Sequence, residues 1–261
     1  MTPIEGLRNF RDVGGLPLTT GGTTRHGVLF RSDALGALTP TGLDELAATA
    51  IGVVVDFRTP AERRMAPDRL PDTRRFETVE LSILEGATAQ LAQDLLSAGG
   101  PDPALIAQAM RSLPTLGELY VGMLRHSAPA FARVARLIAA SHDDAPTAVL
   151  VHCTAGKDRT GVATALMLDA AGVARDAVIA DYAASETRLA GPWADGMLGA
   201  VAAMGVPLTP ELETLLTRTP PAAIEEAFAW IDAEHGGSSA YLRAAGATDA
   251  ELEALGARLV P

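Results

Sequence analysis

Short apolar runs recur along the first 152 residues and predict the strands of a central sheet. The strongest run covers residues 51–57, a second covers 147–151, and shorter candidates lie at 28–30 and 76–81. Continuous apolar runs of this length are typical of strands that are buried on both faces, as in a mostly parallel sheet covered by helices. The pattern therefore predicts an α/β fold with a mostly parallel central sheet flanked by helices.

Helix-start signals stand between and after these runs. Proline follows threonine at residues 39–40 and 209–210, and residues 59–62 and 248–251 have the spacing of capping boxes. After Cys153 no further β-branched run occurs, so we expect the C-terminal half to be all helical. Because neither an internal repeat nor a long linker divides the chain, a single domain over residues 1–261 is favoured.

The alanine- and leucine-rich segment within residues 190–216 has two interpretations. It could form a mobile helical lid over a ligand pocket, or it could be an ordinary core helix. Its charge-free part, residues 196–210, is too short to span a bilayer. The pattern leaves lid and core helix equally open.

Composition narrows the class of protein. The 261 residues are 48% hydrophobic and 20% charged, which excludes a disordered chain, and the net charge is −11. We expect no nucleic-acid partner, because binding nucleic acid needs a basic face, and an anionic membrane surface is disfavoured for the same reason. No signal peptide and no membrane-spanning run can be recognised, so we expect no integral membrane segment and a cytoplasmic location, with non-classical export left open. The oligomeric state is not predicted.

Cysteine and histidine counts restrict metal chemistry. Cys153 is the only cysteine, so an internal disulfide and a zinc site built from several thiolates are both excluded. None of the five histidines stands three or four residues from another. We therefore expect neither a metal nor a cofactor.

The most informative stretch, residues 152–161, joins a predicted buried strand to a helix expected at residues 160–171. Its sequence is HCTAGKDRTG. Backbone N–H groups and the helix dipole converge at such a junction and make it an anion site. The same amides would stabilise the thiolate of Cys153, while Arg159 could hold two phosphate oxygens and Gly156 would let the backbone approach them. Together these features predict a covalent phosphoryl-transfer site.

Less specific interpretations of this loop were weighed against that one. A lone cysteine after a strand is usually a small buried apolar residue, and the junction could be an ordinary turn or a nucleotide cradle. The nucleotide cradle fails on spacing, because Asp158 stands where serine or threonine is required and Val151 stands where the first glycine should. The complete ten-residue string favours the phosphatase interpretation.

At these residues the chain resembles a known family. HC-x5-R is the signature of cysteine-dependent phosphatases, and the form HCTAGKDRTG resembles the bacterial atypical protein-tyrosine/phosphoinositide phosphatases. Further segments that fit this family are residues 9–15 (NFRDVGG), 31–33 (RSD), 55–62 (VDFRTPAE), Asp181-Tyr182 with Ser185, and 240–243 (AYLR). The resemblance covers nearly the whole chain and implies a tyrosine-phosphatase-like fold.

The resemblance also implies a role for each residue of the loop. Cys153 would be the nucleophile that forms a phosphocysteine, and Arg159 would bind the phosphate and the transition state. Thr160 would help the thiolate leave when water hydrolyses the intermediate, and His152 would orient the loop. Phosphate would be bound along the loop by Thr154, Ala155, Gly156, Lys157, Asp158 and Arg159.

The general acid has two candidates. Most tyrosine phosphatases use an aspartate from a Trp-Pro-Asp loop upstream of the cysteine, but here both tryptophans follow the cysteine. Asp158 lies inside the loop, and Asp56 ends the strongest strand, where a parallel sheet lines its ligand crevice. Asp158 could instead brace the loop, and Asp56 could instead pair with Arg58. We favour Asp158.

Lys157 bears on the choice of substrate. Phosphoinositide phosphatases use loop lysines to pair with additional ring phosphates, so the resemblance implies activity on phosphoinositides as well as on phosphotyrosine and phosphoserine or phosphothreonine. Lys157 could equally face solvent and balance Asp158. With Arg159, Arg58 and Arg11 it would make a positive pocket on an acidic protein, because the cleft, not the net charge, focuses the field.

The sequence thus predicts a metal-independent phosphomonoester hydrolase whose partner is a phosphorylated protein or a phosphoinositide. One alternative is a catalytically silent phosphatase-like module that only binds a phosphorylated ligand. A less favoured alternative is a rhodanese-like sulfurtransferase, which also uses a loop cysteine. The intact Cys153, Arg159 and Thr160 disfavour the silent module, and the spacing from Cys153 to Arg159 disfavours the sulfurtransferase.

Overall fold

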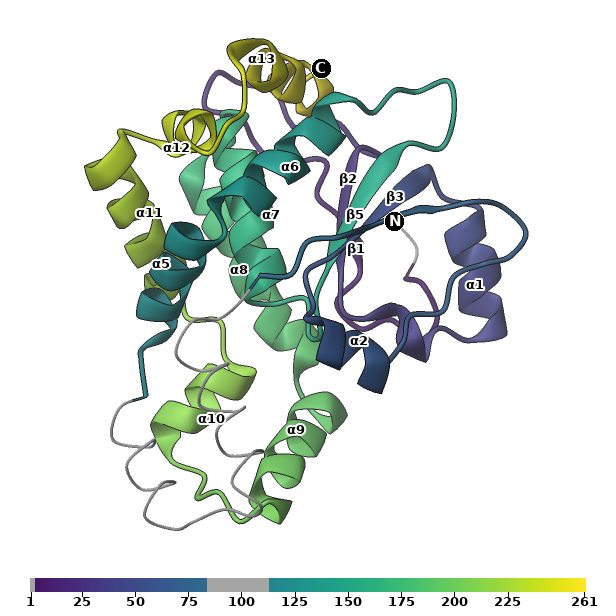
Figure 1. Ribbon diagram of the computed structural model, residues 1–261, viewed down its shortest axis with the longest axis vertical. Coiled ribbons are helices and arrows are strands. Elements are labelled where there is room, and N and C mark those ends of the chain that lie inside the picture. The colour runs from purple at the N-terminus through teal and green to yellow at the C-terminus, as the bar shows by residue number, and fades with distance from the viewer. Residues whose placement is uncertain (1–2, 84–112) are drawn as a thin grey trace.

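One five-stranded sheet forms the centre of the molecule (Figure 1). The computed structural model describes residues 3–83 and 113–261. The strands are β1 (Arg11–Asp12), β2 (Leu29–Ser32), β3 (Ile51–Asp56), β4 (Glu77–Glu80) and β5 (Ala148–His152), in the spatial order β1-β2-β5-β3-β4. β1 is antiparallel to β2, whereas every other neighbouring pair is parallel. The predicted α/β fold with a mostly parallel sheet is confirmed.

The strand sequences explain this order. Every residue of β2, β3 and β5 is buried, and these are the three central strands, which accounts for their continuous apolar runs. β4 lies at an edge and is largely exposed, in keeping with its weaker pattern. β1 is not among the predicted strands because two residues, Arg-Asp, carry no strand periodicity.

Helices surround the sheet. They are α1 (Pro40–Ala47), α2 (Pro60–Met65), α5 (Leu116–His126), α6 (Ala128–Ala139), α7 (Arg159–Ala170), α8 (Arg175–Leu189), α9 (Pro192–Ala203), α10 (Pro210–Thr217), α11 (Pro221–His235), α12 (Ser238–Ala244) and α13 (Asp249–Leu259), with a short 3₁₀ helix at Leu35–Ala37. The helix starts predicted at Thr39, Thr59, Thr209 and Thr248 are confirmed, since each hydroxyl accepts a backbone N–H three residues later. All of residues 153–261 are described, and their regular elements are all helices, as predicted.

Apolar side chains fill both sides of the sheet. Along β5, Val149 and Val151 belong to the core on the side of α5–α8, and Leu150 belongs to the core on the side of α1. Figure 1 shows the same division, with α1 on one side of the strands and α5–α8 on the other. The sheet therefore lies between two helical layers, and the loop after β5 emerges at the carboxyl ends of the parallel strands.

The segment at 190–216 is not a core helix. No residue of α9 is buried, and Thr217 alone is buried in α10. The two helices lie together at one end of the molecule, beyond the carboxyl ends of the strands (Figure 1). This placement rules out the core-helix interpretation, and the lid stays a prediction.

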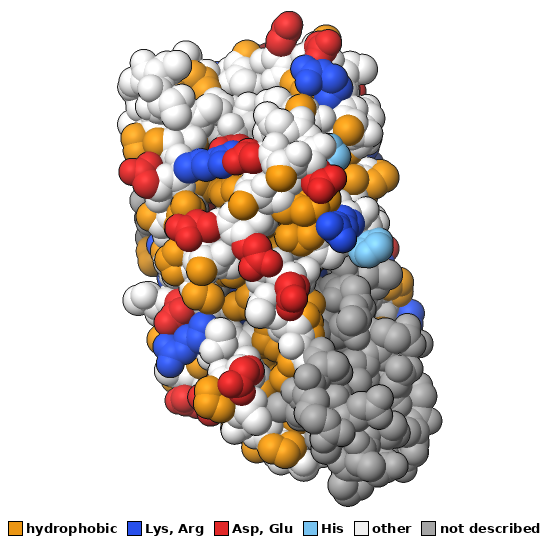
Figure 2. Space-filling model, turned by 90° about the vertical axis from the view of Figure 1, so that its left-hand side faces the viewer, with side chains coloured by type: hydrophobic (Ala, Val, Ile, Leu, Met, Phe, Trp, Pro, Cys, Tyr) orange, Lys and Arg blue, Asp and Glu red, His pale blue; other side chains and the backbone are white. Residues whose placement is uncertain are grey.

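The surface is mixed in charge. Over the face that carries α5 and α11, acidic, basic and apolar side chains are interspersed, and no basic patch gathers there (Figure 2). In the part of the chain that the structure describes, no helix has the length and hydropathy needed to cross a bilayer.

Candidate active site

The loop from residue 153 to residue 158 joins the buried end of β5 to the first turn of α7. Cys153 is 2% exposed, and its Sγ accepts a hydrogen bond from the backbone N–H of Gly156 at 3.2 Å. Arg159 is the first residue of α7. The sulfur thus accepts a backbone N–H in the loop that leads into a helix N-terminus, and such a position stabilises an anion.

Gly156 is required by the backbone of this loop. Its φ is +70°, and a Cβ placed there would lie 2.2 Å from the carbonyl oxygen of Ser32 at the end of β2. Any side chain would therefore meet rigid backbone in a conformation that L-residues rarely adopt. The glycine lets the loop pack against β2 while its N–H faces the sulfur.

Two side chains hold the carbonyl groups of the loop away from the sulfur. Asn9 Nδ2 donates to the carbonyl oxygens of Ala155 and Gly156, both at 3.0 Å, and Arg31 Nη2 donates to Gly156 at 2.8 Å. Because the N–H and C=O of a peptide unit point in opposite directions, tying down the carbonyls turns the next amides toward the interior of the loop. Asn9 belongs to the 9–15 segment and is a positioning residue for the loop.

A buried cluster of ion pairs holds the residues that fix the loop carbonyls. Asp181 on α8 binds Arg11 Nε and Arg31 Nη1, each at 2.6 Å, and the Ser185 hydroxyl accepts from both guanidinium groups. Burial opposes ionisation of Asp181, but the charges of Arg31 and Arg11 lower its pKa below the ordinary value. Burial and the neighbouring Arg31 lower the pKa of Arg11 to about 10. The cluster fastens α8 to β1 and β2 under the loop.

Arg159 is held by a carboxylate from α2. Its Nη1 and Nη2 bind the two oxygens of Glu62 at 2.8 and 2.7 Å, and the hydroxyl of Thr154 donates to the same carboxylate at 2.8 Å. Burial raises the pKa of Glu62, but the hydrogen bonds and charge of Arg159 outweigh it and lower that pKa to about 2. Glu62 was expected as a helix cap and as part of the 55–62 segment that fits the family, but not as a partner of Arg159. The two residues are 97 positions apart, so the local pattern does not show that they pair.

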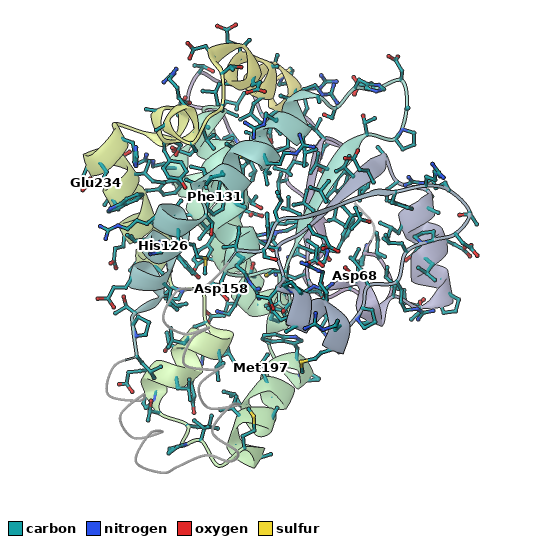
Figure 3. All side chains as sticks on the ribbon, in the orientation of Figure 1. Asp68, His126, Phe131, Asp158, Met197 and Glu234 are labelled. Carbon is teal, nitrogen blue, oxygen red and sulfur yellow. The ribbon has the colours of Figure 1, made fainter. Side chains whose placement is uncertain are left out.

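Asp158 lies against α5 (Figure 3). Its Oδ1 accepts hydrogen bonds from Tyr120 Oη at 2.7 Å and from Lys157 Nζ at 2.8 Å. The hydroxyl of Tyr182 lies 2.8 Å from that of Tyr120 and completes a buried chain. Burial and the nearby Asp158 raise the pKa of Tyr120 well above its ordinary value, so Tyr120 acts as a hydrogen-bond donor.

Lys157 does not face solvent, as one alternative had it, but it does pair with Asp158 as that alternative expected. It is 2% exposed, and besides Asp158 its Nζ donates to the carbonyl oxygens of Leu215 at 2.9 Å and Arg218 at 3.2 Å. These carbonyls stand at the C-terminal end of α10, where a cation is favoured by the helix dipole. Lys157 therefore ties the loop to the α9–α10 segment.

Asp56 lies in an ion-pair cluster beside the loop. It is 1% exposed and is bound by Arg58, whose Nη2 also donates to Asp68 at 2.6 Å. The Nε2 of His152 lies 3.3 Å from the Asp68 carboxylate. Burial raises the pKa of Asp68, but the hydrogen bond from His152 and the charges of His152 and Arg58 lower it overall. Asp56, Asp68 and His152 are close enough together to be metal ligands, but Arg58 already bridges the two carboxylates and supplies the positive charge.

Comparison with known proteins identifies the molecule's relatives. The model of the tyrosine phosphatase family matches residues 2–261. The chain belongs to this family. It is similar to a tyrosine-protein phosphatase of Nostoc commune, with 33% identity over 232 residues, covering 88% of this chain and 73% of the relative. It is also similar to the triple specificity protein phosphatase PtpB of Mycobacterium tuberculosis, with 32% identity over 201 residues, covering 69% of this chain and 67% of the relative.

Membership makes the chain a phosphatase that acts on phosphorylated substrates. The predicted site residues of this phosphatase fall into two groups in the structure. Those from Cys153 to Arg159 follow one another between β5 and α7, where the Gly156 amide faces the Cys153 sulfur. Asp56 and His152 belong to the ion-pair cluster beside this loop. Thr160 follows Arg159 in α7, and its fully buried hydroxyl has no hydrogen-bond partner among the described residues.

Sequence reasoning missed three partners of this phosphatase's site. Glu62 contacts Arg159, Asp68 contacts His152, and Tyr120 contacts Asp158. Glu62 had a signal of its own, because it occupies the last position of a capping box and lies in a segment that fits the family. Tyr120 and Asp68 lie in stretches without a motif, and only the tertiary fold brings them to the loop.

Proposed function

We propose that this phosphatase is a metal-independent phosphomonoester hydrolase that works through a phosphocysteine intermediate. Its substrates are phosphotyrosine, phosphoserine or phosphothreonine in proteins, and phosphoinositides. The observation that carries the proposal is the Cys153 sulfur held under the Gly156 amide at the start of α7, with Arg159 at the far end of the loop. The relative PtpB is named a triple specificity protein phosphatase, and this name supports a broad range of substrates.

In the first step the thiolate of Cys153 attacks phosphorus. An S–P bond forms as the bond from phosphorus to the leaving oxygen breaks, and Asp158 gives its proton to that oxygen. Loop amides and Arg159 hold the three equatorial oxygens, on which transition-state charge is spread. Hydrogen bonds from Asn9 and Arg31 fix the carbonyls of the loop. Little reorganisation is then needed during the reaction.

In the second step water attacks the phosphocysteine. The Asp158 carboxylate takes a proton from the water, the S–P bond breaks, and inorganic phosphate leaves. The buried hydroxyl of Thr160, which has no other partner in the described structure, supplies a hydrogen bond to the departing thiolate. Both steps use only groups of this chain.

Asp158 suits the acid role better than Asp56. Asp56 is buried, and the guanidinium of Arg58 donates hydrogen bonds to both of its oxygens, so neither oxygen is open to a substrate. In Asp158 both contacts fall on Oδ1, and Oδ2 accepts no hydrogen bond from any described residue. Oδ2 is therefore the atom that carries the proton to the substrate.

The remaining features complete the proposal. We assign residues 1–261 to one phosphatase domain in the cytoplasm, with α9 and α10 as a helical lid. Two observations support the lid: these helices contribute one buried residue, Thr217, and they are attached to the loop through Lys157.

The test is phosphate release from p-nitrophenyl phosphate in EDTA and a thiol reductant, comparing wild type with Cys153→Ser. Cys153→Ser exchanges one buried atom and leaves the fold intact, which circular dichroism checks. Turnover that survives the chelator and falls at least about a thousandfold in the variant is expected. Turnover in both proteins would mean that Cys153 is not the nucleophile. Binding of phosphotyrosine without turnover in either would identify the silent module instead.

A further inference from the structure

A pocket of 530 Å³ opens beside the loop, with Thr154 in its lining. Its chemistry comes from Arg8, Arg69, Asp33, Thr154 and Trp193, and the remaining wall is made of alanine, glycine and proline. Thr154 directly follows Cys153, and Trp193 belongs to α9. The pocket is therefore shared by the N-terminal segment, the chain after α2, the loop and the α9–α10 segment.

The pocket is positive although the molecule is acidic. Arg8 and Arg69 are both exposed at its rim. The one acidic side chain in the lining, Asp33, is 6% exposed and accepts the backbone N–H groups of Arg8 and Asn9. Its carboxylate is thus engaged by backbone. The two arginine residues are exposed, and Arg69 Nη1 donates to the carbonyl oxygen of Leu38. The net charge of the chain is −11, so the charge of this pocket is opposite in sign to that of the whole protein.

The position of the pocket relates it to the substrate. The Thr154 hydroxyl bonds Glu62, and Glu62 holds Arg159, so the pocket adjoins the group that binds the scissile phosphate. A substrate whose phosphate reaches Cys153 would place its neighbouring groups here. None of the proposed chemical steps uses Arg8, Arg69 or Trp193.

We propose that this pocket binds acidic side chains that flank the phosphotyrosine of a peptide substrate. The inference rests on the proposed phosphatase function and adds a preference among phosphoproteins. Arginine forks match carboxylates in geometry and charge, and an indole with alanine and proline walls packs against the methylene groups of Asp or Glu and against peptide backbone. The volume is in the range of binding pockets and larger than a single phosphate needs.

The apolar wall favours a peptide over an inositol ring. Every carbon of an inositol headgroup carries a hydroxyl or a phosphate, so the ring would set polar groups against Trp193 and the alanine and proline residues and leave them without partners. A peptide has both charged groups for the arginines and apolar groups for this wall. A second phosphate on a phosphoinositide is the competing occupant, and the experiment distinguishes it.

The experiment compares two phosphotyrosyl peptides, one with glutamates and one with alanines around the phosphotyrosine. Wild type is expected to have a kcat/KM about three- to tenfold higher for the acidic peptide. Arg8→Ala and Arg69→Ala should each reduce that preference, and the double variant should abolish it. Since p-nitrophenyl phosphate is too small to reach the pocket, its kcat/KM should change less than about twofold in all three variants.

Arg64→Ala is the matched control. Arg64 is an exposed arginine of α2 outside the lining of the pocket, so its loss removes one charge from the protein without altering the pocket. The peptide preference should stay at the wild-type value in this variant. Loss of preference with Arg64→Ala as well would show that net charge, not the pocket, selects the peptide, and would overturn the inference.

Two further outcomes count against the pocket. Equal kcat/KM for the two peptides in wild type would refute it directly. If the arginine variants leave turnover of the peptides unchanged but lower turnover of a bisphosphorylated phosphoinositide in phosphatidylcholine vesicles, the site takes a second phosphate instead.

Calorimetric binding of both peptides to Cys153→Ser separates the two proposals, because a preference for the acidic peptide there supports the pocket even if wild type shows no turnover.

Discussion

At the scale of single residues, Glu62 links the fold to the chemistry. The same carboxylate completes the cap of α2 by accepting the backbone N–H of Thr59 and holds both outer nitrogens of Arg159. An arginine that must grip a phosphate gains from being held in one rotamer, because the entropy of ordering a long side chain is then lost on folding and not on binding. Glu62 is a positioning residue in this sense.

Glu62→Gln should therefore weaken both catalysis and stability. A glutamine cannot accept two hydrogen bonds from Arg159 while also capping the helix, so we expect kcat/KM for p-nitrophenyl phosphate to fall about tenfold. The pKa of Glu62, about 2, lies below its ordinary value of 4.5, so its ionised form stabilises the fold. That contribution is complete above about pH 4.5 and is lost as the pH falls toward 2. Urea unfolding should show a loss of about 1–2 kcal/mol at pH 7, after allowance for the partial exposure of Glu62, and a smaller loss at pH 3.

Glu118→Gln is the control for this prediction. Glu118 has the same position in the capping box of α5 but no arginine partner among the described residues. Its substitution should cost only the cap, about 0.5–1 kcal/mol, and leave kcat/KM unchanged. If Glu62→Gln and Glu118→Gln behave alike, the pair with Arg159 has no effect beyond the helix cap.

At the scale of elements, one lysine connects the loop after β5 to α10. Lys157→Met keeps the length and apolar stem of the side chain but removes the ammonium that donates to Leu215 and Arg218. We expect amide hydrogen exchange across α9 and α10 to accelerate about tenfold or more, while β3 and β5 keep their protection. Arg218→Ala is the control, because it removes an exposed ion pair with Glu186 but leaves the carbonyl in place. Unchanged exchange in Lys157→Met would show that α10 is held by other contacts.

The elements also show which features of the structure can be predicted from the sequence. β3, β5 and the start of α7 could be predicted because each is specified by adjacent residues: a doubly buried apolar run, a glycine-containing anion loop and a helix start. Contacts between elements could not be predicted in this way. Lys157 has the same local sequence whether it faces a phosphate, solvent or α10, and only the approach of a helix some 60 residues later decides the outcome. Among the strands that the structure describes, β1 is the antiparallel one, and it was missed because two residues are too few to show a periodic pattern.

At the scale of the whole molecule, a buried cluster of charges joins the sheet to the helical half. Asp181 on α8 binds Arg11 of β1 and Arg31 of β2, and Arg31 also fixes the Gly156 carbonyl. Two guanidinium groups in the interior need a carboxylate, because a buried charge without its partner costs far more than the pair itself contributes. The fold and the loop geometry therefore depend on one aspartate.

Asp181→Asn should lower the free energy of unfolding by about 3–5 kcal/mol at pH 7, as measured by urea denaturation. The pKa of Asp181 is below the ordinary value of 3.8, so its stabilising effect is complete above that pH and is lost as the pH falls below it. The wild-type protein should therefore approach the variant in stability in acid, and the gap between them should close. Asp249→Asn, which breaks the exposed pair with Arg243, is the control and should cost less than about 0.5 kcal/mol. A gap that persists unchanged at low pH would show that the amide disturbs packing and not charge.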